Sequence, residues 1–171
     1  MIVHSQSRLR GLIKLTTLVC SIAGCGIRAT TPAAEITVVP DTVALNSDSD
    51  ATWFAAQARI LNRGATPIYV NACGADAQRK IDDEWQTVWS PICGSTILSR
   101  VEPGAFLTVP ITALGYRRNN SEPRLDPRMR GGVYRFRFGI GSEAPVTINA
   151  PSDLPVLASR VFFVKDTAPT P

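Results

Sequence analysis

The sequence predicts an all-β fold, most economically a β-sandwich. From Glu35 onward apolar and polar residues alternate with period two, which places alternate side chains on opposite faces of a strand. Turns containing proline and glycine separate about seven or eight such segments, and no convincing long amphipathic helix interrupts them. Two sheets can bury their apolar faces against each other, so we expect one sandwich of about 7–8 antiparallel strands.

Length and composition also fit one folded domain. The chain has 171 residues, of which 44% are hydrophobic and 19% charged, and its formal charge is +4. Arg8, Arg10 and Lys14 carry three of these positive charges. Without residues 1–24, 15 basic side chains (18 minus 3) stand against 14 acidic ones. This balance is not that of a nucleic-acid-binding protein, which keeps a strong basic excess.

The N-terminal segment predicts an export signal. Its positive charges precede about nine apolar residues, too few for a membrane-spanning helix, which needs about 20. The stretch "IAGC" (22–25) resembles the lipobox of bacterial lipoproteins, in which a branched apolar residue and two small ones precede the lipidated cysteine. The resemblance implies a lipoprotein signal peptide over 1–24 and acylation of Cys25. An ordinary secretory signal cut elsewhere and a structural first helix are the alternatives.

The resemblance to lipoproteins also implies where the protein is held. Residues 25–34 form a small-residue, proline-containing tether to a domain over 35–165, and a short polar tail follows over 166–171. Gly26, rather than aspartate, follows the lipidated cysteine, as in lipoproteins sent to the outer membrane. We therefore expect a membrane partner through the lipid anchor, at the periplasmic face of the outer membrane if the host has one.

The first strands of the domain lie between residues 54 and 89. Phe54, Ala56, Ala58 and Ile60 alternate with polar residues, and "IYVNAC" resumes the pattern after a proline-containing break. The segment 78–89 predicts a hairpin that turns at 82–84, with aromatic and β-branched residues after the turn.

Cys73 and Cys93 are the cysteines that remain after processing. An exported chain reaches an oxidising compartment, where two thiols usually pair. We therefore predict a structural disulfide, which closes a loop of about 21 residues and contributes roughly 3 kcal/mol in the chain-entropy description. A zinc or redox site is less favoured, because no histidine lies beyond residue 24 and the spacing is not Cys-X-X-Cys.

The remaining strands follow a turn at "EPG" (102–104). In "FLTVPI" the apolar residues share one face, and in "GVYRFRFGI" four large apolar residues point one way while Arg135 and Arg137 point the other. The segment 159–165 closes the domain. The four core-facing residues of the second strand are Tyr134, Phe136, Phe138 and Ile140.

The stretch "GGVY" (131–134) resembles the tyrosine-corner region in the penultimate strand of immunoglobulin-like (Ig-like) domains. Residues 54–165 are similar to Ig-like modules of bacterial envelope proteins, which implies a binding or scaffolding domain. They also loosely resemble the bacterial intracellular proteinase-inhibitor domain, in the "EW…VW" hairpin, the "PG" turn and "G-x-Y". This second resemblance implies, as the alternative, inhibition of a protease through an exposed loop such as 115–132.

The sequence predicts no catalytic residue, no metal site and no cofactor. The only histidine, His4, lies in the N-terminal segment, so Ser-His-Asp and Cys-His arrangements are absent from the rest of the chain. Three consecutive carboxylates at 82–84 fit a solvated hairpin turn. The acidic stretch 46–50 departs from a calcium loop, because Trp53 and Arg59 stand where glycine and glutamate are needed.

Two sets of residues are candidate binding surfaces. The arginines of the loop 115–132 favour bidentate contacts with carboxylate or phosphate, and predict docking of an anionic envelope component or an envelope protein. Trp85 and Trp89 lie four apart on one strand, hence on one face, and predict an aromatic platform for a sugar or peptide. A solvated loop and tryptophans packed against the core are the alternatives. The loop arginines are Arg117, Arg118, Arg124, Arg128 and Arg130.

Overall fold

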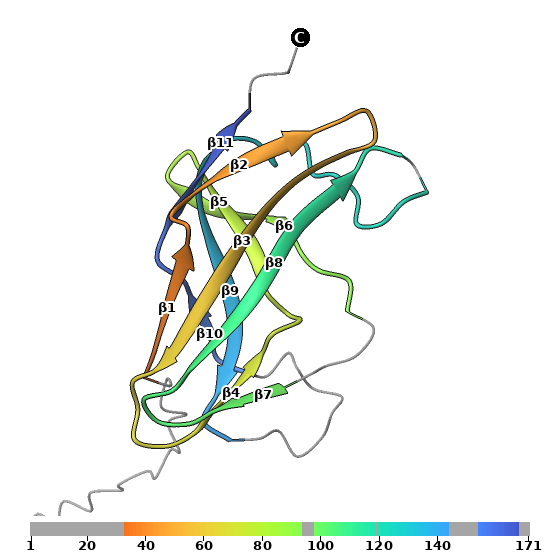
Figure 1. The fold of residues 1–171 in the computed structure, drawn as a ribbon. Coiled ribbons are helices and arrows are strands. Elements are labelled where there is room, and N and C mark those ends of the chain that lie inside the picture. The colour runs from red at the N-terminus through yellow and green to blue at the C-terminus, as the bar shows by residue number, and fades with distance from the viewer. Residues whose placement is uncertain (1–32, 94–97, 119, 144–153, 168–171) are drawn as a thin grey trace, which may run out of the picture.

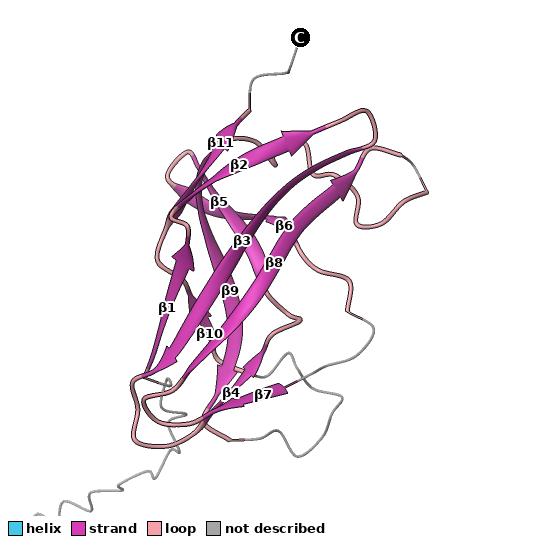
Figure 2. Ribbon diagram, viewed as in Figure 1, coloured by secondary structure: helices cyan, strands magenta, loops and turns pink. Residues whose placement is uncertain are grey.

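The structure is a computed structural model that describes residues 33–93, 98–118, 120–143 and 154–167. The predicted signal peptide over 1–24, the lipidation site Cys25, most of the tether and the end of the tail lie outside these residues. Within the described ranges the chain forms strands and loops and no helix (Figure 2). No helix capable of spanning a bilayer is therefore found in the described part of the chain.

The described residues form eleven strands, which is more than the seven or eight predicted. The additional ones include two very short strands, β7 and β10, in which too few residues alternate to give a pattern. The strands are β1 (Ala34–Val39), β2 (Thr42–Ser47), β3 (Ala51–Asn62), β4 (Ile68–Asn71), β5 (Asp76–Ile81), β6 (Glu84–Trp89), β7 (Leu98–Val101), β8 (Phe106–Tyr116), β9 (Gly132–Gly141), β10 (Val156–Ala158) and β11 (Phe162–Asp166).

The strands are hydrogen-bonded into one curled sheet whose two halves pack face to face as a sandwich (Figure 1). One layer contains β1, β3 and β8, and the other is built around β9, with β5 and β6 beside it. β2 and β11 connect the layers, because β2 pairs with β3 and β11 pairs with both β2 and β9. The β2–β11 pair is parallel and so differs from the predicted antiparallel arrangement.

Aromatic side chains from both layers meet in the core. Phe54 of β3 lies edge-on to Tyr134 of β9, with 5.2 Å between ring centroids. Phe136 of β9 stacks on Phe162 of β11 at 4.9 Å. All four rings are fully buried. The predicted inward faces of β3 and β9 are therefore confirmed, and burial of these faces is the main stabilising contribution to the sandwich.

Tyr134 forms the tyrosine corner that its sequence context predicts. Its hydroxyl donates a hydrogen bond of 2.6 Å to the carbonyl of Arg130, four residues upstream. Burial of the ring raises the pKa of the Tyr134 hydroxyl to about 12. Together with the two-layer β architecture, this contact confirms the predicted Ig-like β-sandwich.

Asn62, at the end of β3, is a fully buried polar side chain that joins two loops. Its amide nitrogen donates to the carbonyls of Thr66 and Val101, at 2.8 and 3.0 Å. Its amide oxygen accepts from the backbone N–H of Gly64 at 2.9 Å. One side chain therefore satisfies groups in the β3–β4 loop and at the end of β7.

Candidate functional site: a groove along a sheet edge

The β5–β6 hairpin turns at Asp82 and Asp83, as predicted, and both have positive φ angles, of 48° and 66°. The hairpin also contains a β-bulge that the sequence analysis missed. Ala77 faces Trp89 but Gln78 faces Thr87, so Val88 is an extra residue on β6. A bulge shifts the alternation of side chains along a strand.

The bulge separates the two tryptophans. Trp89 faces Ala77 and packs against the core, and its indole N–H donates to the carbonyl of Leu114 at 3.0 Å. Trp85 lies on the outer face, where the guanidinium of Arg135 lies 4.3 Å from the centre of its ring. The prediction that both tryptophans share one face, as a platform, is therefore wrong. The packed alternative holds for Trp89.

Two loop arginines fasten the loop after β8 to the β2–β3 turn. Arg117 donates to the hydroxyls of Ser47 and Thr52, at 3.0 and 2.7 Å, and to the carbonyl of Asp48. Arg118 forms an ion pair of 2.9 Å with Asp50. Polar side chains and a carbonyl of the β2–β3 turn are thus bound to these two arginines.

The other three loop arginines contact groups nearby. Arg128 binds Asp126 in a bidentate ion pair, with a shortest distance of 2.5 Å, and also donates to Gln86 on β6 at 2.9 Å. The hydrogen bond from Arg128 holds the pKa of the Asp126 carboxyl below its ordinary value. Arg124 pairs with Glu122 at 3.4 Å, and Arg130 donates to the carbonyl of Pro127 at 3.2 Å.

The loop arginines thus have structural contacts within the chain. Arg117, Arg118 and Arg124 line one hollow of about 320 Å³, so the fold brings three of the five together. Each of them also engages a polar group of the loop or of the β2–β3 turn. Docking of an anion by this loop stays a prediction, and an anion would compete with these contacts.

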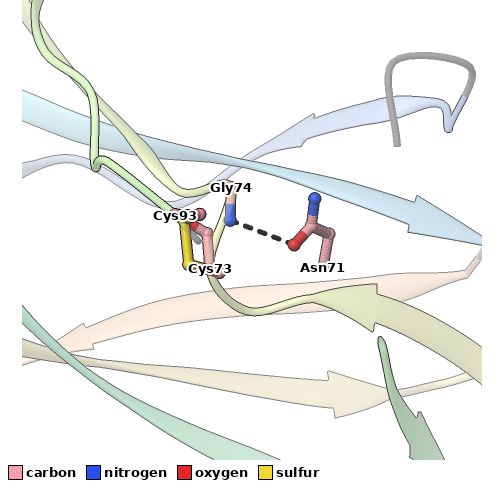
Figure 3. The surroundings of a disulfide bond; sticks show 4 residues. All are labelled: Asn71, Cys73, Gly74 and Cys93. Carbon is pink, nitrogen blue, oxygen red and sulfur yellow. Dashed lines mark hydrogen bonds between the residues drawn. A yellow bond between two sulfur atoms is a disulfide. The ribbon is translucent and has the colours of Figure 1, made fainter. Parts of the chain in front are cut away.

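The predicted disulfide between Cys73 and Cys93 is present, with 6.0 Å between the Cα atoms (Figure 3). Cys73 lies in the turn after β4, where Asn71 accepts a hydrogen bond of 3.1 Å from the backbone N–H of Gly74. A Cβ atom at Gly74 would lie 2.6 Å from the amide nitrogen of Asn71, so a larger residue here would have to displace the Asn71 side chain. The disulfide ties the segment after β6 to this turn.

Beside the disulfide lies a hollow of about 630 Å³, which we call the edge groove. One wall comes from the β4–β5 turn, the end of β6 and the segment after it, and the other from β8 and from residues 122–123 of the loop that follows it. This volume is in the range of ligand-binding clefts. The lining residues are Ala72, Cys73, Ala75, Trp89, Pro91, Ile92, Pro110, Ile111, Thr112, Leu114, Glu122 and Pro123.

The edge groove is predominantly apolar. Ile92 on its rim is 67% exposed, the highest value among the exposed large apolar side chains of the described residues, whereas Ala75 and Ile111 are buried at its base. Among the described residues of the lining, Glu122 is the one ionisable side chain apart from the disulfide-bonded Cys73, and it is paired with Arg124. The lining therefore offers apolar surface rather than a nucleophile with a neighbouring base.

β8 borders the edge groove with one side of its backbone. Along the other side it pairs with β3, from Phe106 opposite Leu61 to Tyr116 opposite Ala51. In the described part of the chain no strand pairs with the groove side between residues 108 and 112. This site could not be predicted from the alternation of apolar and polar residues, because an edge strand and a central strand have similar alternation. Pro110 is the one signal that marks an edge.

Comparison with known proteins gives no family. No family description and no curated protein matches the sequence. Among solved structures, the chain is similar to an X-ray structure of structural-genomics target SoR45, with 11% identity over 83% of this chain and 92% of that chain and a TM-score of 0.46. It is similar to the CARDB domain of a Pyrococcus furiosus protein (12%, 81% and 90%, TM-score 0.34) and to a PapD-like domain of human CEP192 (11%, 97% and 100%, TM-score 0.36).

Proposed function

We propose that this protein is a lipid-anchored protein of the cell envelope whose single Ig-like domain binds or scaffolds a partner and catalyses no reaction. The observation that carries the binding role is the edge groove, an apolar cleft of about 630 Å³ at an edge of the sandwich. Binding of a partner over such an exposed apolar cleft removes apolar surface from water, which is favourable.

The character of the partner follows from what the domain offers. The five loop arginines have contacts within the chain, whereas Ile92 is exposed in the groove. We therefore favour an envelope protein as the partner over an anionic envelope component or a nucleic acid. The described residues of the lining provide no pair of ionisable groups for acid–base chemistry, which supports a binding role.

The anchor is supported by the sequence alone. The stretch "IAGC" (22–25) follows a positively charged and then an apolar segment, and Cys25 is the proposed site of acylation. More than one acyl chain on this residue holds a protein stably at a membrane. The proposed location is the periplasmic face of the outer membrane, where the host has one.

The experiment expresses the full chain in a lipoprotein-processing bacterium and separates membrane from soluble fractions. The wild type and Cys20→Ser are expected in the membrane, with an intact mass that lacks residues 1–24 and carries lipid. Cys25→Ser is expected to lose both the lipid and the membrane location. A protein that still contains residues 1–24, or is released unacylated, contradicts the anchor. Copurification of one envelope protein with the wild type, lost in the groove variant Ile92→Asp, tests the binding role.

A further inference from the structure

We propose that the edge groove binds an extended segment of a partner protein as an added β-strand along β8. This inference rests on the proposed binding function and names its ligand class. The expected segment is short and has apolar side chains at alternate positions.

The backbone of β8 presents hydrogen-bonding groups on its groove side. Trp89 donates to the carbonyl of Leu114, and the backbone of Tyr116 bonds to the loop. The backbone groups of Leu114 and Tyr116 therefore point away from β3. Since backbone direction alternates along an antiparallel strand, Thr108, Pro110 and Thr112 face the same way. We call these three residues the open edge. It offers two N–H donors and three carbonyl acceptors in register for a further strand.

The chain already pairs one residue of the following loop with this side of β8. The N–H of Tyr116 donates to the carbonyl of Pro123 at 2.9 Å, and the N–H of Leu125 donates to the carbonyl of Tyr116 at 2.9 Å. This is a parallel bridge between Tyr116 and Arg124. The open edge continues the line that this segment occupies, so a partner segment would extend a pairing that the fold has begun.

The edge groove lies beside β8, where it can receive side chains of an added strand. Side chains of an added strand alternate between the two faces of the sheet. One set would enter the edge groove against Ala75, Trp89 and Ile111, and cover Ile92 on the rim. The other set would face solvent beside Thr112. Four steps from residue 108 to residue 112 span about 13 Å, so two or three partner side chains enter the groove.

Pro110 favours a partner segment over a second copy of this chain. Proline has no N–H, so the open edge lacks one donor in its middle. A peptide that pairs with β8 loses one hydrogen bond at this position, whereas two β8 strands paired edge to edge lose one from each copy. Proline on an edge strand is a common protection against such self-pairing.

The test selects short random peptides displayed on phage for binding to the purified full chain, and measures the affinities of the enriched peptides. Thr112→Pro removes a donor of the open edge and is expected to weaken them about tenfold or more, which corresponds to one hydrogen bond of roughly 1.4 kcal/mol. Thr112→Val keeps the N–H and is its matched control. Enriched peptides are expected to protect the Thr108 and Thr112 amides from hydrogen exchange.

A second pair of variants tests the groove. Ile92→Asp places a charge on the exposed rim and is expected to abolish binding, whereas Val161→Asp changes an aliphatic side chain that is 50% exposed and lies outside the groove. Both positions are exposed, so folding is expected to persist, and circular dichroism checks this for every variant.

Three outcomes overturn the inference. The selection enriches no peptide, the enriched peptides bind Thr112→Pro and Ile92→Asp as well as wild type, or the wild type is a dimer that Thr112→Pro converts to a monomer. Failure of the proposed function is distinguishable from these. Loss of acylation contradicts the anchor without affecting peptide binding, and an envelope protein that copurifies equally with Thr112→Pro and Ile92→Asp leaves a binding function at another surface.

Discussion

Replacing Asn62 by aspartate is expected to make the stability of the domain depend on pH. The two side chains have the same shape, and the carboxylate still accepts the hydrogen bond from Gly64. The other carboxylate oxygen, however, meets the carbonyls of Thr66 and Val101, which are 2.8 and 3.0 Å from the amide nitrogen of the wild type. Burial and these carbonyls favour the protonated acid, which can donate to one of them.

The magnitude follows from the contacts. Asn62→Ala removes three hydrogen bonds, each with a net value of about 1 kcal/mol, and is expected to cost roughly 3 kcal/mol at any pH. Asn62→Asp loses one such bond when protonated, about 1 kcal/mol. At pH 7 the buried carboxyl must also stay protonated, roughly 3 pH units above its ordinary pKa. This lowers the free energy of unfolding by up to about 4 kcal/mol more.

The sign of the effect is fixed by linkage. The pKa of the new carboxyl is raised in the folded state. The loss of unfolding free energy caused by Asn62→Asp is therefore smallest below the unfolded-state pKa of about 3.9, and it grows as the pH rises toward the folded-state pKa. Urea unfolding followed by tryptophan fluorescence at about pH 4 and 7 measures this cost, with wild type at each pH as reference. Equal costs for Asn62→Asp and Asn62→Ala at both pH values would refute the reasoning.

Three further predictions use other positions. Gly104 has a φ of 74° and open space around its Cα, so Gly104→Ala is expected to cost about 1 kcal/mol through backbone strain alone, and Gly104→Asn less, in urea unfolding; equal costs contradict this. The pKa of Asp126 is lowered by Arg128, so the stability lost in Arg128→Met is expected above pH 3.8 and to fade as the pH drops below it, and a pH-independent loss contradicts the assignment. Pro110→Thr supplies the missing donor of the open edge and is expected to cause concentration-dependent association in sedimentation experiments, whereas a monomer at all concentrations argues against an accessible edge.

The part of the fold that depends on local alternation could be predicted from the sequence. The inward faces of β3, β8 and β9 follow from period two, and the turn at 82–83 from its residues. The disulfide follows from two cysteines and an inferred compartment. These features depend on neighbours along the chain or on composition.

The rest depends on contacts between distant residues. One extra residue in β6, Val88, moves Trp89 to the core face and leaves Trp85 outside, and such a bulge depends on register with β5. The partners of Arg117 lie about 70 residues away in the β2–β3 turn, so the sequence of the loop alone does not indicate these hydrogen bonds. The edge groove forms where the β4–β5 turn, β6 and β8 meet, which periodicity within any one segment does not show.

The position of β11 has a consequence for how the polypeptide matures. Residues 162–166 lie between β2 and β9 and supply the backbone bonds that join the two layers through this route. A nascent chain that is synthesised only up to β10 lacks β11, and strand pairing across more than 100 residues is slow. We therefore expect the two layers to join through β11 only after the last strand has been synthesised, so that a chain undergoing the proposed export would still lack this pairing.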